Sequence, residues 1–162
     1  MANKTVFTKH LESNRILVTR EFAAPLAATW KAWTESELLD KWWAPRPWKT
    51  ETKSMDFREG GSWLYCMVGP TGEKHWSCRN FISIDRNRNF TTSDFFCDEN
   101  GNVAQNTPGS QWIITFHDNG PATKVEVAIT FNTEEDMKVL VAMGFEGGFA
   151  MAHSNLDELL AS

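Results

Sequence analysis

The chain has 162 residues, of which 41% are hydrophobic and 23% charged, and its net charge is −5 at pH 7. This length suits one domain with a core and room for a pocket. The acidic balance without a basic block excludes nucleic acid and anionic membrane surfaces as partners. No segment approaches the roughly 18 apolar residues of a membrane helix. Because the first residues lack a signal-peptide pattern, we expect a soluble protein of the cytoplasm.

The N-terminal half begins with a strand and two short helices. The run from Arg15 to Phe22 is rich in β-branched residues and predicts the first strand. Pro25 is tolerated in a first helical turn, so a helix is expected to begin beside it. A second short helix follows, with Thr34 or Ser36 as its cap.

Four of the eight tryptophans fall in this corner: Trp30, Trp33, Trp42 and Trp43. Such large rings either fill a core or wall a cavity. Trp30 and Trp33 are three residues apart on the first helix, and we expect them to hold the helix pair against the sheet. Trp42 and Trp43 end the second helix, where we expect them to form the mouth of a pocket, with only one of the two adjacent indoles pointing inward.

Alternating segments separated by turns predict a series of strands further along the chain. A hairpin turn is expected at 69–72, a long polar loop at 98–109 and a second turn at 118–121. The expected strands are 48–57, 62–68, 75–84, 89–97, 111–117 and 124–131.

The last element is predicted to be one long helix from Thr133, which can act as its cap, to the end of the chain. Its apolar stripe includes Gly144 and Gly148, and Gly147 is the position where it could kink.

This order of elements predicts an α+β helix-grip fold, in which a curved antiparallel sheet of about six to seven strands wraps around the long C-terminal helix. Residues 1–12 are expected to be a tail and residues 13–162 a single domain. A bent sheet cannot close against one helix everywhere, so we expect an internal cavity between the two.

Several motifs resemble a known family: the pattern RxFxAPxxxxWxAWT over Arg20 to Thr34, LLDKWWAP after it, the segment Asp56 to Gly61, and Met67. The chain resembles the START-like SRPBCC domains, and within them the homologues of the activator of heat-shock protein 90 ATPase. The resemblance implies the helix-grip fold. Family members include ligand carriers, resistance proteins, and polyketide cyclases and aromatases. Arg79 and Phe149 stand where members often have glycine and tryptophan.

The faces of the predicted strands define a candidate ligand cavity. Alternation places Trp63, Tyr65 and Met67 on one face, and we expect similar rows on the following strands to face the helix. The candidate cavity residues are Trp42, Trp43, Trp63, Tyr65, Met67, Trp76, Cys78, Asn80, Trp112, Ile114, Gly144, Gly148 and Met151.

No catalytic or metal signature is present, so no catalytic residue, metal or cofactor is predicted. The polar groups expected near the pocket strands are Asp56, Arg58, Tyr65, Arg79 and Asp94, and none forms a nucleophile and base pair. Asp56 and Arg58 are expected to be an ion pair.

The histidines and cysteines are assigned to structure. His75, His117 and His153 have no partner at metal-ligand spacing, and we expect His117 to be a solvated turn residue and His153 to be exposed. The three cysteines, Cys66, Cys78 and Cys97, form no CxxC motif, which is typical of reduced thiols, and are expected to be small buried apolar residues.

The first functional hypothesis is a binding protein for a small hydrophobic or aromatic molecule of unknown identity. The alternatives are an enzyme of the polyketide cyclase or aromatase type, and a chaperone-interacting module that stimulates heat-shock protein 90 ATPase. A buried carboxylate or histidine facing the cavity would favour the enzyme. An exposed edge strand and the tryptophan corner are compatible with a homodimer.

Overall fold

Residues 4–162 are described by a computed structural model, and they form one antiparallel sheet of eight strands with four α-helices. The strands are β1 Val6–His10, β2 Arg15–Phe22, β3 Lys49–Met55, β4 Ser62–Val68, β5 Lys74–Asp85, β6 Asn89–Cys97, β7 Ser110–Asn119 and β8 Ala122–Phe131. The helices are α1 Leu26–Thr34, α2 Ser36–Trp42, α3 Glu134–Ala142 and α4 Phe145–Ala161, with a short 3-10 helix at Leu11–Ser13.

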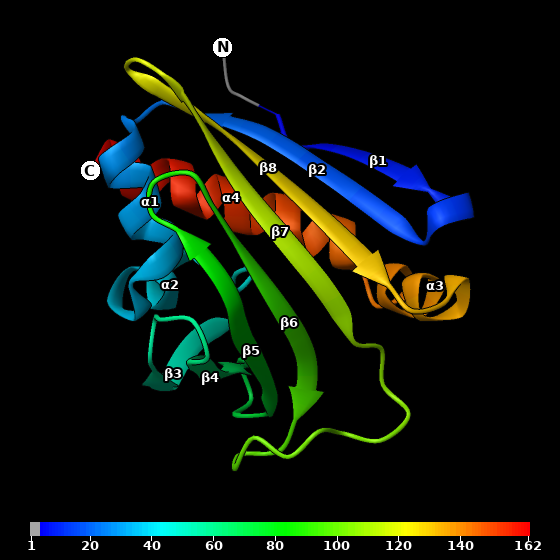
Figure 1. The fold of residues 1–162 in the computed structure, drawn as a ribbon. Helices are drawn as coiled ribbons and strands as arrows, with labels where there is room; N and C mark the ends of the chain where they lie inside the picture. The colour runs from blue at the N-terminus through cyan, green and yellow to red at the C-terminus, as the bar shows by residue number, and fades with distance from the viewer. Residues whose placement is uncertain (1–3) are drawn as a thin grey trace.

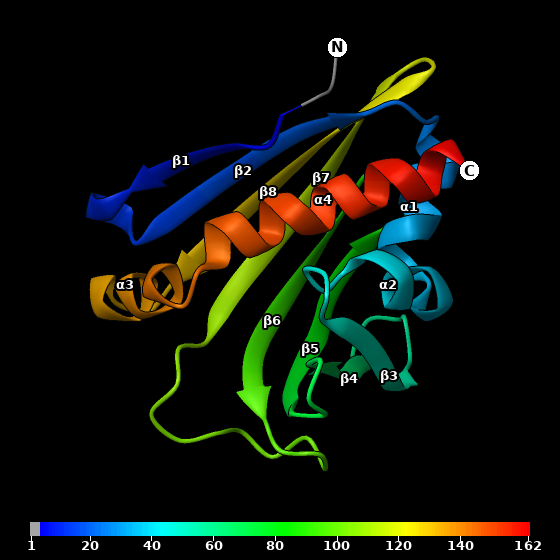
Figure 2. The same ribbon diagram turned by 180° about the vertical axis from the view of Figure 1, so that it is seen from behind.

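The sheet curves around the last helix. Its strand order is β1-β2-β8-β7-β6-β5-β4-β3, so the chain segment with α1 and α2 carries the fold from β2 to the opposite edge at β3. Figure 1 shows the curvature, and Figure 2 shows α4 crossing the concave face, with α1 and α2 at one end and α3 at the other. This is the helix-grip arrangement that the order of elements predicted. Within residues 4–162, every helix is too short or too polar to cross a bilayer.

The sheet has eight strands, more than the number expected, because β1 lies in the segment 1–12 that was expected to be a tail. It pairs antiparallel with β2, from Val6 opposite Thr19 to His10 opposite Arg15. Most of its side chains are exposed, so backbone pairing rather than a buried apolar face defines the strand. Residues 1–3 of the expected tail lie outside the described residues.

Helix α1 begins directly after Pro25, as predicted, but α2 has no side-chain cap. The Oγ1 of Thr34 donates to the carbonyl oxygen of Trp30 at 2.8 Å, within its own helix, and Ser36 is already the first residue of α2. The expected cap is therefore absent, and the burial of Leu39 and Trp42 anchors this short helix.

The C-terminal segment is two helices rather than one. Thr133 caps α3 as predicted, with its Oγ1 accepting from the backbone N–H of Asp136 at 3.1 Å. The break falls at Gly144 and not at Gly147, which lies inside α4. Gly144 has a φ of 87°, in the left-handed region that glycine adopts without steric cost, so the chain can end α3 and turn there.

The concave face of the sheet and the tryptophans of α1 form the core. Trp33 is 1% exposed, and its ring lies 4.8 Å from that of Trp42 in an edge-on contact. Trp30 packs against Phe116 of β7, with ring centroids 5.0 Å apart. The assignment of Trp30 and Trp33 to structure is confirmed.

Candidate functional site

A cavity of about 260 Å³ lies between strands β4–β8 and the helices α3 and α4. Aromatic rings form much of its wall: Trp43, Tyr65, Phe95, Phe96, Trp112, Phe131, Phe145 and Phe149. Polar groups are few: the side chains of His75, Ser77, Asp94 and Ser110 join the Tyr65 hydroxyl. Met143, which is 60% exposed, also lines the cavity, so the space reaches the surface beside the break between α3 and α4.

Only one of the two adjacent tryptophans reaches this cavity. The Nε1 of Trp43 donates to the hydroxyl oxygen of Tyr65 at 3.0 Å, which fixes the indole against β4. Trp42 points into the core, where its Nε1 donates to the carbonyl oxygen of Ala32 at 2.9 Å. Both rings are buried, so Trp43 is part of the cavity wall rather than a pocket mouth. Only one of the two adjacent indoles points into the cavity, as expected.

The register of β5 turns a different set of side chains to the cavity from the expected one. Tyr65 lies opposite Ser77 and Trp63 opposite Arg79. Residues directly opposite each other in an antiparallel pair share a face, so Ser77 and Arg79 lie on the concave side with Tyr65.

The expected β5 residues lie on the outer face of the sheet. The Nζ of Lys53 lies 5.8 Å from the ring centroid of Trp76, and the Oδ1 of Asn80 accepts from the Oγ of Ser62 at 2.7 Å. Cys78 shares this face. The prediction failed because both alternating sets of β5 contain apolar residues, and the pattern could not show that a charged one is buried.

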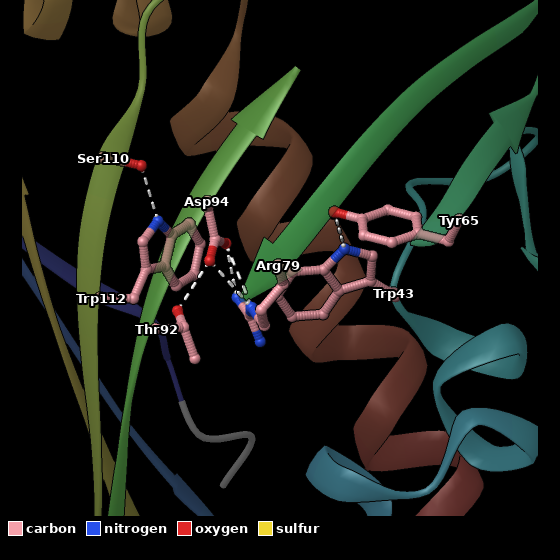
Figure 3. Close-up of polar contacts among 7 residues, drawn as sticks. All are labelled: Trp43, Tyr65, Arg79, Thr92, Asp94, Ser110 and Trp112. Atoms are coloured by element: carbon pink, nitrogen blue, oxygen red, sulfur yellow. Dashed lines mark hydrogen bonds and ion pairs between the residues drawn. The ribbon is translucent and has the colours of Figure 1, made fainter. Parts of the chain in front are cut away.

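Arg79 is buried to 1% exposure, and it is held by one carboxylate and three indoles. Its Nη2 donates to the Oδ2 of Asp94 at 2.9 Å, and its Nε lies 3.1 Å from both carboxylate oxygens (Figure 3). The guanidinium carbon lies 4.9 Å from the ring centroids of Trp43 and Trp112, and 5.7 Å from that of Trp63. A cation over aromatic faces is attracted by the ring quadrupoles, so these contacts offset part of the desolvation of the charge.

Asp94 connects this buried pair to the cavity. Its side chain is 16% exposed and lines the cavity, whereas Arg79 lies behind it. The Oγ1 of Thr92 donates to its Oδ1 at 2.7 Å, and beside it the Oγ of Ser110 accepts from the Nε1 of Trp112 at 2.9 Å (Figure 3). The polar end of the cavity is therefore an ordered network on three neighbouring strands.

Tyr65 presents a neutral phenol to the same space. Burial, followed by the charge of Asp94, raises its pKa to about 12, and the charge of Arg79 and hydrogen bonds from Trp43 and Ser77 only partly oppose this rise. Its ring stacks on Trp63, with centroids 3.9 Å apart. At neutral pH the hydroxyl keeps its proton and can donate it to a bound molecule.

Some of the residues predicted for the cavity meet there: Trp43, Tyr65, Met67, Trp112, Gly144 and Gly148. Trp42, Trp63 and Ile114 are in the core instead, and Met151 is 45% exposed on the far side of α4. The sequence reasoning missed Phe145 and Phe149, which stack with centroids 5.3 Å apart and line the helical wall. Their spacing of four residues was the available signal.

The expected exposure of His153 is wrong, because this residue is 1% exposed. Phe149, Ala152, His153 and Leu156 form one buried helical stripe with the spacing of a core-facing face. The His153 ring lies 4.2 Å from that of Phe149, and its Nδ1 lies 2.9 Å from the Oγ1 of Thr5. Burial, with a contribution from the charge of Arg20, lowers its pKa to about 3, so the imidazole is neutral.

The expected ion pair is present, with the Nε of Arg58 2.7 Å from the Oδ2 of Asp56. His117 is exposed as expected, 46% in its side chain and beside Glu126, but it lies in strand β7 rather than in a turn. Cys66 and Cys78 are buried and Cys97 is half-buried, all as free thiols. In the described part of the chain, no three His, Cys, Asp or Glu side chains gather as metal ligands would.

The fold and its cavity define a START-like helix-grip protein. The family model described as "Activator of Hsp90 ATPase homolog 1-like protein" matches residues 23–161. The chain belongs to this family, as its motifs predicted.

Solved structures agree with this assignment. The chain is similar to protein Ms6760 from Mycobacterium smegmatis, with 29% identity, a TM-score of 0.89, and coverage of 97% of this chain and 96% of that one. A protein from Arthrobacter aurescens is 26% identical, with a TM-score of 0.91 and coverage of 96% and 91%. CalU16 from Micromonospora echinospora shares the fold at 20% identity and a TM-score of 0.63, with coverage of 99% and 84%. No curated protein matches the chain.

Proposed function

We propose that this protein binds a small, largely apolar molecule in the cavity between the sheet and α4. The observation that carries the proposal is the unfilled space of about 260 Å³ inside a wall of aromatic rings. Small-molecule sites are typically concave and mostly apolar, with a few placed polar groups that orient the ligand. Tyr65, Ser77, Asp94 and Ser110 are such groups in this cavity.

Gly148 offers a direct test, because it lines the cavity from the helical side. A Cβ at this position would lie 3.6 Å from the Cγ of Pro45, an ordinary contact, so leucine can be accepted there while its branches fill the space. Gly147 is the matched control. It is exposed, and a Cβ there would meet no atom within 4 Å.

The assay is the quenching of tryptophan fluorescence by Nile red, a neutral dye that responds to its environment. Gly148→Leu and Tyr65→Ala should each weaken dye binding by about tenfold or more, which corresponds to about 1.4 kcal/mol, and Gly147→Leu should bind as the wild type does. Wild-type affinity in both cavity variants would count against the proposed site.

A second candidate is an enzyme of the cyclase or aromatase type, because Asp94 is the cavity-facing carboxylate that such chemistry would need. Asp94 is held by Arg79 and Thr92, and Tyr65 is a protonated phenol beside it. A ligand's own reactive groups could exchange protons with this pair. Turnover of a polyketide-like substrate that Asp94→Asn abolishes would support the enzyme over a carrier.

A further inference from the structure

The polar end of the cavity presents a carboxylate to a ligand. Its described lining offers no unpaired side chain with a permanent positive charge. Among the described residues that line the cavity, the ionisable side chains are Tyr65, His75 and Asp94. Arg79 is not part of the lining, because its Nε and Nη2 bind Asp94 and the indoles of Trp43 and Trp112 cover it. His75 is exposed at the rim.

Asp94 keeps capacity for one more hydrogen bond. Three donors bind its two oxygens: the Oγ1 of Thr92 donates to Oδ1, the Nη2 of Arg79 donates to Oδ2, and the Nε of Arg79 is shared between both oxygens. A carboxylate has about four acceptor positions, so a further donor can bind from the cavity side, where this side chain is partly exposed. Tyr65 lies on the same face of the sheet, with its hydroxyl accepting from Trp43 and its own proton available.

We infer that the cavity selects neutral ligands that carry a hydroxyl or N–H donor at their buried end, and that it rejects carboxylates of the same shape. The inference rests on the proposed function and names the ligand class for that site. A ligand hydroxyl can donate to Asp94 and accept from Tyr65. A ligand carboxylate would lie against the carboxylate of Asp94 in a poorly solvated space, with the nearest buried cation already paired, and this costs binding free energy.

The test compares three probes with one aromatic body in competition with Nile red at about pH 7.5, where the carboxylate of a free probe is ionised. 2-Naphthol carries the donor, 2-methoxynaphthalene keeps the size without a donor, and 2-naphthoate carries the negative charge. We expect 2-naphthol to displace the dye at concentrations about tenfold or more below those of the other two, as for one hydrogen bond to a charged group.

The outcomes separate this inference from the proposed function. If 2-naphthoate or 2-methoxynaphthalene binds as tightly as 2-naphthol, the selectivity is wrong while the site stands. If neither the dye nor any probe binds a chain with an intact melting transition, the proposed function itself fails.

Asp94→Asn extends the test. The substitution keeps the size of the side chain, removes its charge and leaves Arg79 uncompensated at the end of the cavity. The preference for 2-naphthol over 2-naphthoate should fall by about tenfold or reverse, because one contact with a charged group is lost. Asp85→Asn, which removes an exposed acid from the same sheet, should keep the wild-type preference. An unchanged preference in folded Asp94→Asn would overturn the role of Asp94. If this variant does not fold, the relative affinities of the three probes for the wild type decide whether the selectivity is right.

Discussion

The buried imidazole of His153 should make the protein less stable in mild acid, by an amount that can be calculated. The pKa of His153 falls from 6.5 to about 3 on folding, because of burial and the charge of Arg20. Below pH 6.5 the unfolded chain binds a proton that the native protein does not, so stability is complete above that value and decreases as pH falls towards about 3. At pH 5 the loss is about 2 kcal/mol, since one pH unit below the unfolded pKa is worth about 1.4 kcal/mol.

Urea denaturation at about pH 7.5 and about pH 5 measures this loss as a change in the free energy of unfolding. The wild type should lose about 2 kcal/mol more than His153→Gln between the two values. His117→Gln, which removes a histidine with a 46% exposed side chain, should behave as the wild type does. Equal losses in the wild type and His153→Gln would refute the neutral buried imidazole.

Three further predictions concern stability and reactivity. Gly144→Ala should lower the stability by about 1 kcal/mol because it forces a side chain into a φ of 87°, whereas Gly147→Ala, inside α4, should raise it by up to about 1 kcal/mol. Thermal denaturation of both variants would show these opposite signs. Equal effects would contradict the assigned break at Gly144. Arg79→Met should lower the free energy of unfolding by about 3–5 kcal/mol because it leaves the poorly solvated carboxylate of Asp94 without its partner. A loss below about 1 kcal/mol would show that the pair is well solvated in solution. Burial raises the pKa of the Cys97 thiol to about 11 and also raises the pKa values of the Cys66 and Cys78 thiols. At about pH 8 a disulfide reagent should therefore modify the native chain much more slowly than the chain unfolded in urea. Equal rates would contradict the burial of the thiols.

The elements that the sequence predicted well are those in which one local signal decides. Val125, Val127, Ile129 and Phe131 alternate with polar residues, and all four are buried on the concave face of β8. Thr133 is a cap whose partner is three residues away, and its geometry needs no distant contact. The Trp-rich motif also identified the family, because its residues serve the packing of α1 and α2 on the sheet.

The site was harder to predict because its decisive contacts are between strands. Alternation shows that Arg79 and Trp76 point to opposite faces of β5, but it does not show which face is concave. Only the pairing of β5 with β6, which places Arg79 opposite Asp94, makes burial of the arginine favourable. The prediction of one C-terminal helix failed for a similar reason. Any of its glycines could break the helix from the sequence alone, and the break falls at Gly144 because the chain turns there from α3 onto the sheet.

The two positions where the resemblance leads us to expect glycine and tryptophan, Arg79 and Phe149, lie on opposite sides of the same cavity. Arg79 lies behind Asp94 on the sheet, and Phe149 is part of the helical wall. Arg79 lies close to both Trp43 and Trp112, at 4.9 Å from each ring, and so fills space on the sheet side that a glycine would leave open. Phe149 is smaller than a tryptophan and lines the cavity from α4, where it therefore leaves more room. The free space is consequently shifted towards the helix, and its sheet side ends in a compensated ion pair. A relative with glycine and tryptophan at these positions would offer a cavity of different shape and charge, so its ligand would not transfer to this protein.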